Sequence, residues 1–377
     1  MRARHIKFPY KTPRDAKANR TEAFFLSSDL PRSFQQKAQG QIKIALPYRV
    51  EQTSPPDNPI DSRFTLCLYD FAPSLGWYQQ PHLQELELRA TLRALAQWHA
   101  YFWLAHDPSG TKTELASQLW ETGSYWHLGQ QPAGQIAKLK PNFERLREEF
   151  DWPAEWDLGA RLERVALKAS EIAHGLDADC KKLEDGAWVN AGFQTIIHGD
   201  PKAPNLFFKR GLPVAVVDEK PTTVAPEPEV GLIDMQWCGR GIGAVDVVYC
   251  IAASADPKLI PVGADPAAVV QSLVDEYHNM LLASFVKYGV ASDLVSASAA
   301  LPVEVFQEQF EWAWIDLARV CVGDHWGSVT KDILATRRGK MAFNAYNKSE
   351  PVQRMVAQLT DVYLKRRELA AGGQASL

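Results

Sequence analysis

The stretch "IIHGDPKAPN", residues 196–205, constrains the fold of this chain more than any other feature of the sequence. Ile196 and Ile197 are β-branched residues of the kind that fill buried strands. Pro201 and Pro204 exclude a regular helix across the residues that follow. The sequence therefore places a His, an Asp, a Lys and an Asn on a stiff turn directly after a strand. Turns held by a rigid scaffold in this way often carry function.

The composition is that of a globular protein with a large core. The chain has 377 residues, of which 46% are hydrophobic, and this length is typical of two lobes or domains. The 41 Lys and Arg residues face 45 Asp and Glu residues, which gives a net charge of −4. This balance, without a basic stripe, does not favour a nucleic-acid partner. No apolar run is long enough to span a bilayer, so we expect no membrane partner.

The cysteines and the N-terminus bear on localisation. The five cysteines are widely spaced and form no C-x-x-C pair, so neither a disulfide framework nor a zinc site is predicted. A reducing, cytoplasmic compartment follows from this pattern. The first residues are basic, which leaves an organellar transit peptide as the alternative, although the segment is not Ser-rich and contains two prolines.

Hydrophobic periodicity predicts an α+β protein with a small β-containing N-terminal part and a larger helical part. Strands are predicted in "RFTLCLYDF" (63–71), "FQTIIHGD" and "EVGLIDMQW", with "LPVAVVDE" as a further candidate. Proline-rich polar segments predict loops over 53–62 and 219–229. Helices are predicted over 81–104, 159–183, 266–288, 304–322 and 353–370.

The polar turn has the residue types that phosphoryl transfer requires. Asp200 and Asn205 offer a carboxylate and an amide oxygen five residues apart, which suits a divalent cation or a hydroxyl group beside one. Lys202 offers a cation for the transferring phosphoryl group. Asp234 ends a second strand and supplies a further carboxylate for Mg²⁺. Asp218, which ends "VAVVD", is the alternative to Asp234; we prefer Asp234 because of the residues that follow it.

A structural interpretation of the turn competes with the functional one. The spacing His-x-Asp-x-x-x-x-Asn also occurs in turns whose polar groups only satisfy one another. Lys202 could be a solvated side chain, and His198 fits a structural hydrogen bond better than a catalytic base. The strand before the turn and the "IDMQW" segment after it favour function, because D-x-x-x-x-N followed by a metal-binding Asp is the kinase arrangement.

With these motifs the sequence resembles the aminoglycoside phosphotransferase and choline kinase superfamily, and within it the ecdysteroid-kinase-like (CHK kinase-like) proteins. The resemblance is carried by "HGDPKAPNLFF", "IDMQWCGRGIGAVDVVYCI", "LAQWHAYFW" and "GSYWHL". It extends over about residues 1–370 and is most specific over 196–250.

The resemblance implies a protein-kinase-like fold with two lobes. A reduced N-lobe would occupy residues 1–72 and a large helical C-lobe residues 73–370, followed by a flexible tail over 371–377. The implied cofactors are ATP and Mg²⁺, and the implied partner is a small hydroxylated molecule, whose identity and the oligomeric state stay open.

By motif position, the resemblance implies that Asp200 is the catalytic base and that Asn205 and Asp234 are the Mg²⁺ ligands. Asp246 matches a residue that braces the catalytic loop, with a helix N-cap as its alternative. His99 matches a structural histidine. The "SYWHL" segment either lines the acceptor pocket or belongs to the core.

The sequence departs from the family pattern at its N-terminus. No Gly-x-Gly precedes Gly40, the first glycine, so we expect the chain to begin at about the third strand, without the first strands and the glycine-rich loop. This would be either a truncation or a real loss. Lys7 then matches the lysine that holds the α/β-phosphates and Glu22 its helix partner, with surface positions as the alternatives. The backbone near Tyr69 and Phe71 would meet adenine, although the family often has an acidic residue at position 69.

These motifs are consistent with two functions. The first is an ATP-dependent small-molecule kinase that transfers the γ-phosphate to a hydroxyl group, with weak or absent activity if the glycine-rich loop is lost. The second is a catalytically impaired pseudokinase that binds a nucleotide or another small molecule. A metal-dependent hydrolase is disfavoured, because the sequence has no His-rich ligand set.

Overall fold

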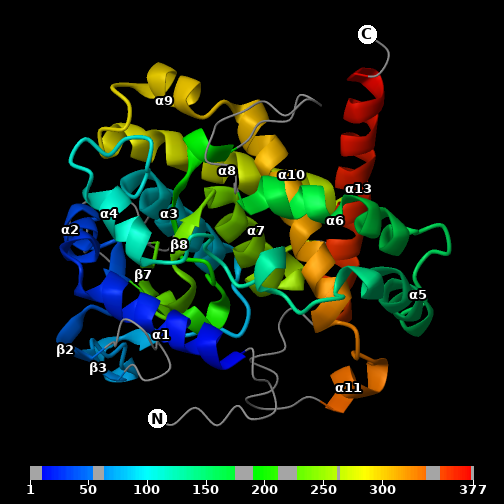
Figure 1. Cartoon of the computed structure of the whole chain (residues 1–377), viewed down its shortest axis with the longest axis horizontal. Helices are drawn as coiled ribbons and strands as arrows, with labels where there is room; N and C mark the ends of the chain where they lie inside the picture. The colour runs from blue at the N-terminus through cyan, green and yellow to red at the C-terminus, as the bar shows by residue number, and fades with distance from the viewer. Residues whose placement is uncertain are drawn as a thin grey trace, which may run out of the picture.

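Helices dominate the architecture, and small sheets complete it (Figure 1). The computed structural model describes residues 11–53, 63–174, 190–210, 227–260, 264–336 and 349–374. The predicted α+β class is thus confirmed. The helices are α1 (Lys11–Ser27), α2 (Asp29–Lys37), α3 (Glu85–Tyr101), α4 (Thr111–Gln118), α5 (Leu139–Glu149), α6 (Leu158–His174), α7 (Gly243–Ser254), α8 (Pro266–Lys287), α9 (Leu294–Ala300), α10 (Val303–Val320), α11 (Lys331–Thr336) and α13 (Glu350–Gln374).

In the described residues, three small sheets lie among these helices. One has the strand order β1-β7-β6-β4, and the other two pair β2 with β3 and β5 with β8. The strands are β1 (Ile42–Ile44), β2 (Pro47–Thr53), β3 (Arg63–Leu68), β4 (Trp77–Tyr78), β5 (Thr195–Ile197), β6 (Leu206–Lys209), β7 (Glu229–Leu232) and β8 (Gly239–Gly241).

The antiparallel pair β6–β7 positions the candidate site. Leu206 lies opposite Leu232 in this pair, so β6 begins where β7 ends. The backbone N–H of Ile233 donates to the carbonyl oxygen of Asn205 at 3.1 Å and extends the pairing by one bond. Asn205, just before β6, and Asp234, just after β7, therefore lie at the same end of the sheet.

The core is continuous through the helices. Buried side chains join one cluster that extends from Phe25 in α1 to Leu364 in α13. At one end, Phe25 and Phe34 pack on Trp98 of α3, with ring centroids 5.3 and 5.6 Å from the Trp98 ring. β1 pairs with β7 in parallel, so segments before and after residue 72 share a sheet as well as this core. No helix in the described parts of the chain has the length and apolarity needed to cross a membrane.

The long helices agree with the sequence prediction. The predictions over 81–104, 266–288, 304–322 and 353–370 correspond to α3, α8, α10 and α13, and 159–183 corresponds to α6 as far as residue 174. The predicted strand 63–71 ends earlier, at Leu68, and the Tyr69 N–H still donates to the carbonyl oxygen of Leu46, just before β2. Residues 371–374 are helical where we expected a tail.

Several elements were not predicted. The sequence "QIKIALPYRVEQT" forms β1 and β2, and α2 precedes them. The candidate strand "LPVAVVDE" with Asp218, the segment with Lys7, and residues 54–62 of the predicted loop lie outside the described residues.

Candidate functional site

The polar turn begins at Gly199, a position that requires glycine. Gly199 has φ +81°, and a Cβ atom there would lie 2.2 Å from the carbonyl oxygen of Trp237 and 2.7 Å from the backbone nitrogen of Ser124. The left-handed backbone favours glycine, and the close packing excludes a Cβ atom. The turn therefore packs tightly between the segment after β7 and the segment that precedes Tyr125.

Asp246, in the first turn of helix α7, binds the backbone of the polar turn through its carboxylate. Its two carboxylate oxygens accept the backbone N–H groups of His198 and Gly199 at 2.7 and 2.9 Å. The N-cap of α7 is Ile242, so Asp246 does not take the alternative role of a helix cap. A carboxylate that accepts two backbone N–H bonds in the interior fixes the loop rigidly.

Two further buried side chains orient Asp246. His99 Nε2 lies 3.1 Å from an Asp246 oxygen, and His99 Nδ1 lies 2.6 Å from the hydroxyl of Tyr277. Burial and the Asp246 charge hold the pKa of Tyr277 well above its ordinary value, so the hydroxyl keeps its proton. If that hydroxyl donates to Nδ1, His99 carries its proton on Nε2 and donates to Asp246. His99 is thus a structural residue.

Asp200 is buried and carries the central carboxylate of the site. Its Oδ2 atom accepts hydrogen bonds from Lys202 Nζ at 2.6 Å and from Asn205 Nδ2 at 3.0 Å. Burial raises the pKa of Asp200, while Lys202 acts in the opposite direction and Asp234 adds to the increase. Its Oδ1 atom is buried and has no hydrogen-bond partner among the described residues.

Asp234 contributes a second carboxylate from a strained turn. Its backbone is left-handed, with φ 65° and ψ 66°, which is uncommon outside glycine and concentrates at functional sites. Its Oδ1 atom is buried and likewise lacks a hydrogen-bond partner in the described parts of the chain. Asp200 and Asp234 thus each have one buried carboxylate oxygen that could bind a group other than a protein side chain.

The side chain of Glu22, on helix α1, extends to the segment that follows Asp234. Its Oε1 atom accepts the backbone N–H of Met235 at 3.2 Å, next to Asp234. Burial and, second, the negative charge of Asp234 raise the pKa of Glu22 to about 7. Asn19, one turn earlier, accepts a hydrogen bond from Gln236 at 3.1 Å and anchors α1 on this turn.

The donor set fits a hard divalent cation. Asp200 and Asp234 each have an unsatisfied oxygen, and because Asn205 Nδ2 donates to Asp200, Asn205 Oδ1 is its remaining oxygen donor. Oxygen ligands of this kind suit Mg²⁺, which keeps several of its waters and takes few protein ligands. No group of three or more His, Cys, Asp or Glu residues that could hold a metal occurs among the described residues, so the fit rests on two carboxylates and one amide.

Tyr69 and Phe71 lie beside this site and are packed among aromatic rings. Phe71 is 5% exposed and stacks on Phe207 of β6, with ring centroids 4.8 Å apart. Tyr69 packs edge-on against Phe71, and Lys43 Nζ lies 4.6 Å from the Tyr69 ring centroid. Ile233, the residue before Asp234, packs against the same cluster. Tyr69 and Phe71, the residues expected to contact adenine, thus belong to an aromatic cluster next to the candidate metal ligand Asp234.

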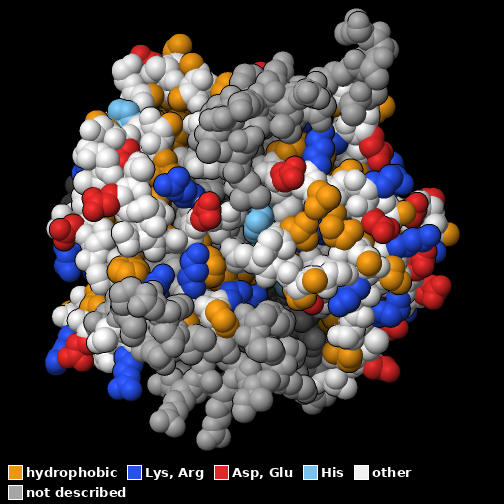
Figure 2. All heavy atoms as spheres, viewed as in Figure 1, with side chains coloured by type: hydrophobic (Ala, Val, Ile, Leu, Met, Phe, Trp, Pro, Cys, Tyr) orange, Lys and Arg blue, Asp and Glu red, His pale blue; other side chains and the backbone are white. Residues whose placement is uncertain are grey.

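An aromatic wall that the sequence did not predict flanks the other side of the turn. Trp237 stacks on Trp120 with centroids 5.3 Å apart and contacts Tyr125 at 5.7 Å. Two cations of α1 cover these rings: Lys17 Nζ lies 4.3 Å from the Trp120 centroid and the Arg14 guanidinium 5.5 Å from that of Trp237. Figure 2 shows Lys and Arg side chains near the centre of this face, close to where Figure 1 places α1.

Of the two aromatic residues in "SYWHL", Tyr125 belongs to this wall and Trp126 to the core. Tyr125 is half-buried, and its hydroxyl lies 3.1 Å from that of Tyr249, whereas Trp126 is fully buried. Ser254 is another contributor that sequence reasoning missed, because its Oγ accepts the Ala203 N–H at 2.8 Å inside the turn. Only the three-dimensional contact identifies Ser254, since no motif marks it.

The structure thus brings together Asp200, Lys202, Asn205, Asp234 and Glu22, with Tyr69 and Phe71 in the neighbouring cluster. Lys7 and Asp218 lie outside the described residues. No family model matches the sequence, and comparison with curated proteins gives no match.

Proposed function

We propose that this chain is an ATP-dependent kinase that transfers the γ-phosphate to a hydroxyl group of a small organic molecule. One observation carries the proposal: Asp200 and Asp234 each present a buried carboxylate oxygen without a hydrogen-bond partner among the described residues. Leaving two such oxygens bare is costly unless a cation or a hydrogen-bond donor of a bound molecule engages them. Asp234 in addition has a left-handed backbone, which is a strained conformation typical of functional sites.

The proposal includes a kinase-like arrangement of two lobes around this site. Glu22 on helix α1 accepts the backbone N–H of Met235, next to Asp234, and is the proposed counterpart of the kinase helix glutamate that pairs with the phosphate-binding lysine. The β6–β7 pair brings Asn205 and Asp234 to one end, in the order D-x-x-x-x-N, strand, strand, Asp. The aromatic cluster of Phe71 and Phe207 is the proposed adenine side.

Asp200 is the proposed base. Its unsatisfied Oδ1 atom would accept the proton of the acceptor hydroxyl, while Lys202 and Asn205 hold the Oδ2 atom in place. Lys202, about one-quarter exposed, also places a positive charge next to the reacting group. Mg²⁺ held by Asn205 and Asp234 would supply neutralisation of the phosphate charges. Asp246 fixes the loop through two backbone bonds and so limits the motion of Asp200.

A catalytically impaired nucleotide or small-molecule binder is the second candidate. The observation that favours it is the Phe71 ring, which is buried and stacked on Phe207 where the proposal places adenine. Adenine would have to displace this ring or bind beside it.

Turnover and binding separate the two candidates. Mg²⁺-dependent ATP consumption is measured with a panel of alcohols, amino alcohols and sugars, on the wild type, on Asp200→Asn and on the control Asp256→Asn. Asp256 is the half-buried N-cap of the 3-10 helix Pro257–Leu259. The kinase proposal expects acceptor-dependent turnover that falls about 10²–10⁴-fold in Asp200→Asn and not in the control. Nucleotide binding without turnover supports the binder, and turnover that Asp200→Asn leaves unchanged contradicts the kinase proposal.

A further inference from the structure

Helix α1 extends from the candidate metal ligand Asp234 toward the aromatic wall. Glu22 accepts the backbone N–H of Met235, and Asn19 accepts a hydrogen bond from Gln236. These two contacts align α1 with the chain segment that follows Asp234. The N-terminal turns of α1 therefore lie on the far side of Asp234 from the aromatic cluster that is the proposed adenine side.

Two cations in these N-terminal turns lie against the wall. Lys17 Nζ is 4.3 Å from the centroid of the Trp120 ring, and the Arg14 guanidinium carbon is 5.5 Å from that of Trp237. At a rise of 1.5 Å per residue, their backbone positions are roughly 8 and 12 Å from that of Glu22 along the helix axis. Both cations are thus next to the candidate transfer site without being part of it.

Neither cation is hydrogen-bonded to a carboxylate in the described parts of the chain. Lys17 is half-buried, and both its burial and the charge of Arg20 lower its pKa, which Glu121 opposes only in part. Arg14 Nε is buried without a hydrogen-bond partner, and a carboxylate oxygen of Asp15 lies 4.0 Å away from it. Because buried charges are costly unless they are paired and hydrogen-bonded, an anion at this place would be favoured.

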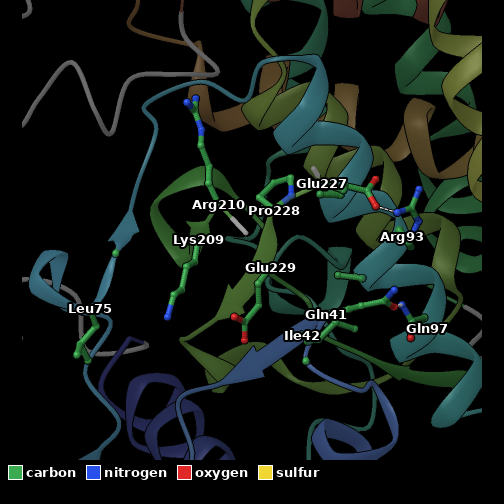
Figure 3. Close-up of a pocket in the computed structure, with 14 residues that line it drawn as sticks. Gln41, Ile42, Leu75, Arg93, Gln97, Lys209, Arg210, Glu227, Pro228 and Glu229 are labelled. Carbon is green, nitrogen blue, oxygen red and sulfur yellow. Dashed lines mark hydrogen bonds and ion pairs between the residues drawn. The ribbon is translucent and has the colours of Figure 1, made fainter. Parts of the chain in front are cut away.

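A pocket at the opposite end of the sheet has balanced charges instead. Its volume is about 640 Å³, and it lies between α3 and the starts of β1 and β7 (Figure 3). Arg93 pairs with Glu227, and Lys209 lies opposite Glu229 on the neighbouring strand. The side chain of Arg210 points away from these residues in Figure 3. This pocket therefore gives no reason to expect an ionic ligand.

The covered rings of the wall disfavour a cationic ligand. Aromatic faces can bind the ammonium group of a ligand, but here Lys17 and Arg14 already lie over Trp120 and Trp237. A ring face attracts a cation without accepting a strong hydrogen bond, so the N–H donors of both side chains stay available. Arg and Lys donors of this kind are the usual partners of carboxylate and phosphate groups.

We infer that Lys17 and Arg14 bind an anionic group of a small-molecule ligand, which under the proposed function is the phosphate acceptor with its hydroxyl at Asp200. The acceptor role rests on the proposed function, whereas the preference for an anion rests on the two cations.

Binding is tested on the full chain with three six-carbon probes that differ at one end: 6-hydroxyhexanoate, 1,6-hexanediol and 6-amino-1-hexanol. NMR or calorimetric titration in saturating MgADP should show saturable binding of the hydroxy acid, at least tenfold weaker binding of the diol, and no saturation with the amino alcohol. Equal affinities for the hydroxy acid and the diol, or no saturable binding of the hydroxy acid, would overturn the inference. Displacement of the hydroxy acid by MgADP would assign the cations to the nucleotide and would overturn it as well.

Variants of α1 locate the site. Lys17→Met and Arg14→Met should each weaken 6-hydroxyhexanoate binding about tenfold and leave the diol unaffected, whereas Lys17→Arg, which keeps the cation, should retain the preference for the hydroxy acid. Lys168→Met is the matched control, because Lys168 Nζ also lies over a tryptophan ring, 5.4 Å from the Trp312 centroid. If Lys17→Met fails to fold, Arg14→Met decides, and unchanged affinity in a folded variant refutes the assignment.

ATP consumption separates this inference from the kinase proposal. Selective binding of the hydroxy acid without any ATP consumption would support the anion site and contradict kinase activity. ATP consumption that is faster with the amino alcohol or the diol than with the hydroxy acid would support the kinase and overturn the inference.

Discussion

Asp246 accepts the backbone N–H of Gly199 at 2.9 Å, across 47 residues of sequence and in the fully buried interior. This contact joins helix α7 to the turn that carries Asp200. The turn therefore does not hold its shape through local bonds alone, and its geometry depends on a charge in a different element.

The first prediction concerns the charge of Asp246. Asp246→Asn keeps the size of the side chain but replaces one acceptor oxygen with an NH₂ group that faces backbone or histidine donors. We expect a loss of about 2–4 kcal/mol in unfolding free energy, measured by urea denaturation. Asp256→Asn removes a helix cap that accepts one backbone N–H and should cost at most about 1 kcal/mol. Equal losses of unfolding free energy in the two variants would show that the buried hydrogen bonds of Asp246 stabilise the fold no more than a helix cap does.

The second prediction compares two glycines with nearly the same backbone. Gly199 and Gly40 have φ +81° and +80°, but a Cβ at Gly199 meets the Trp237 oxygen at 2.2 Å, whereas a Cβ at Gly40 meets nothing within 4 Å. Gly40→Ala should therefore cost only the conformational term, about 1–2 kcal/mol. Gly199→Ala should cost at least about 2 kcal/mol more, as seen in thermal or urea unfolding. Similar costs at the two positions would mean that the turn can move away from Trp237.

The third prediction is a pH dependence that originates at Glu22. Its pKa is about 7 in the folded chain against an ordinary 4.5, so the folded state binds the proton more tightly than the unfolded state does. This contribution to stability is complete below pH 4.5 and is lost as the pH rises through 7. Glu22→Gln should match the wild type at pH 4.5 and exceed it by roughly 3 kcal/mol at pH 8.

The measurement is the difference in unfolding free energy between wild type and Glu22→Gln across this pH range. Glu85→Gln, at a largely exposed glutamate of helix α3, serves as the control for the effect of the substitution itself. Saturating MgADP should shrink the difference, since a bound cation favours the ionised form of Glu22. A difference that is constant from pH 4.5 to 8 contradicts the raised pKa of Glu22.

The sequence predicted the parts of the fold that local patterns determine. Helix α3 follows from apolar residues at helical spacing, and β5 from the β-branched "TII" before the turn. The prolines at 201 and 204 correctly excluded an α-helix across the turn, which contains only the short 3-10 helix Ala203–Asn205. β1 escaped notice because three residues carry no readable period, and its partner β7 lies almost 190 residues further along the chain.

The site was predictable only as a set of residue types. Motif spacing singled out Asp200, Asn205 and Asp234. Nothing in the sequence indicates, however, that Asp234 has a left-handed backbone. The burial of Phe71 against Phe207 depends on the packing of β6 beside the segment after β3, which no local pattern encodes. The cations over Trp120 and Trp237 were missed for the same reason, since α1 lies about 100 and 220 residues away from those rings.

The central claim is that Asn205 and Asp234 hold one divalent cation, which binds with a nucleotide, beside the proposed base Asp200. Electron paramagnetic resonance of Mn²⁺ in the presence of ATP tests it directly, on wild type, Asp234→Asn and the control Asp256→Asn. We predict one nucleotide-dependent Mn²⁺ site in wild type and control, weakened about 10–100-fold or more in Asp234→Asn. Mn²⁺ and ATP affinities that are the same in all three proteins would contradict the account.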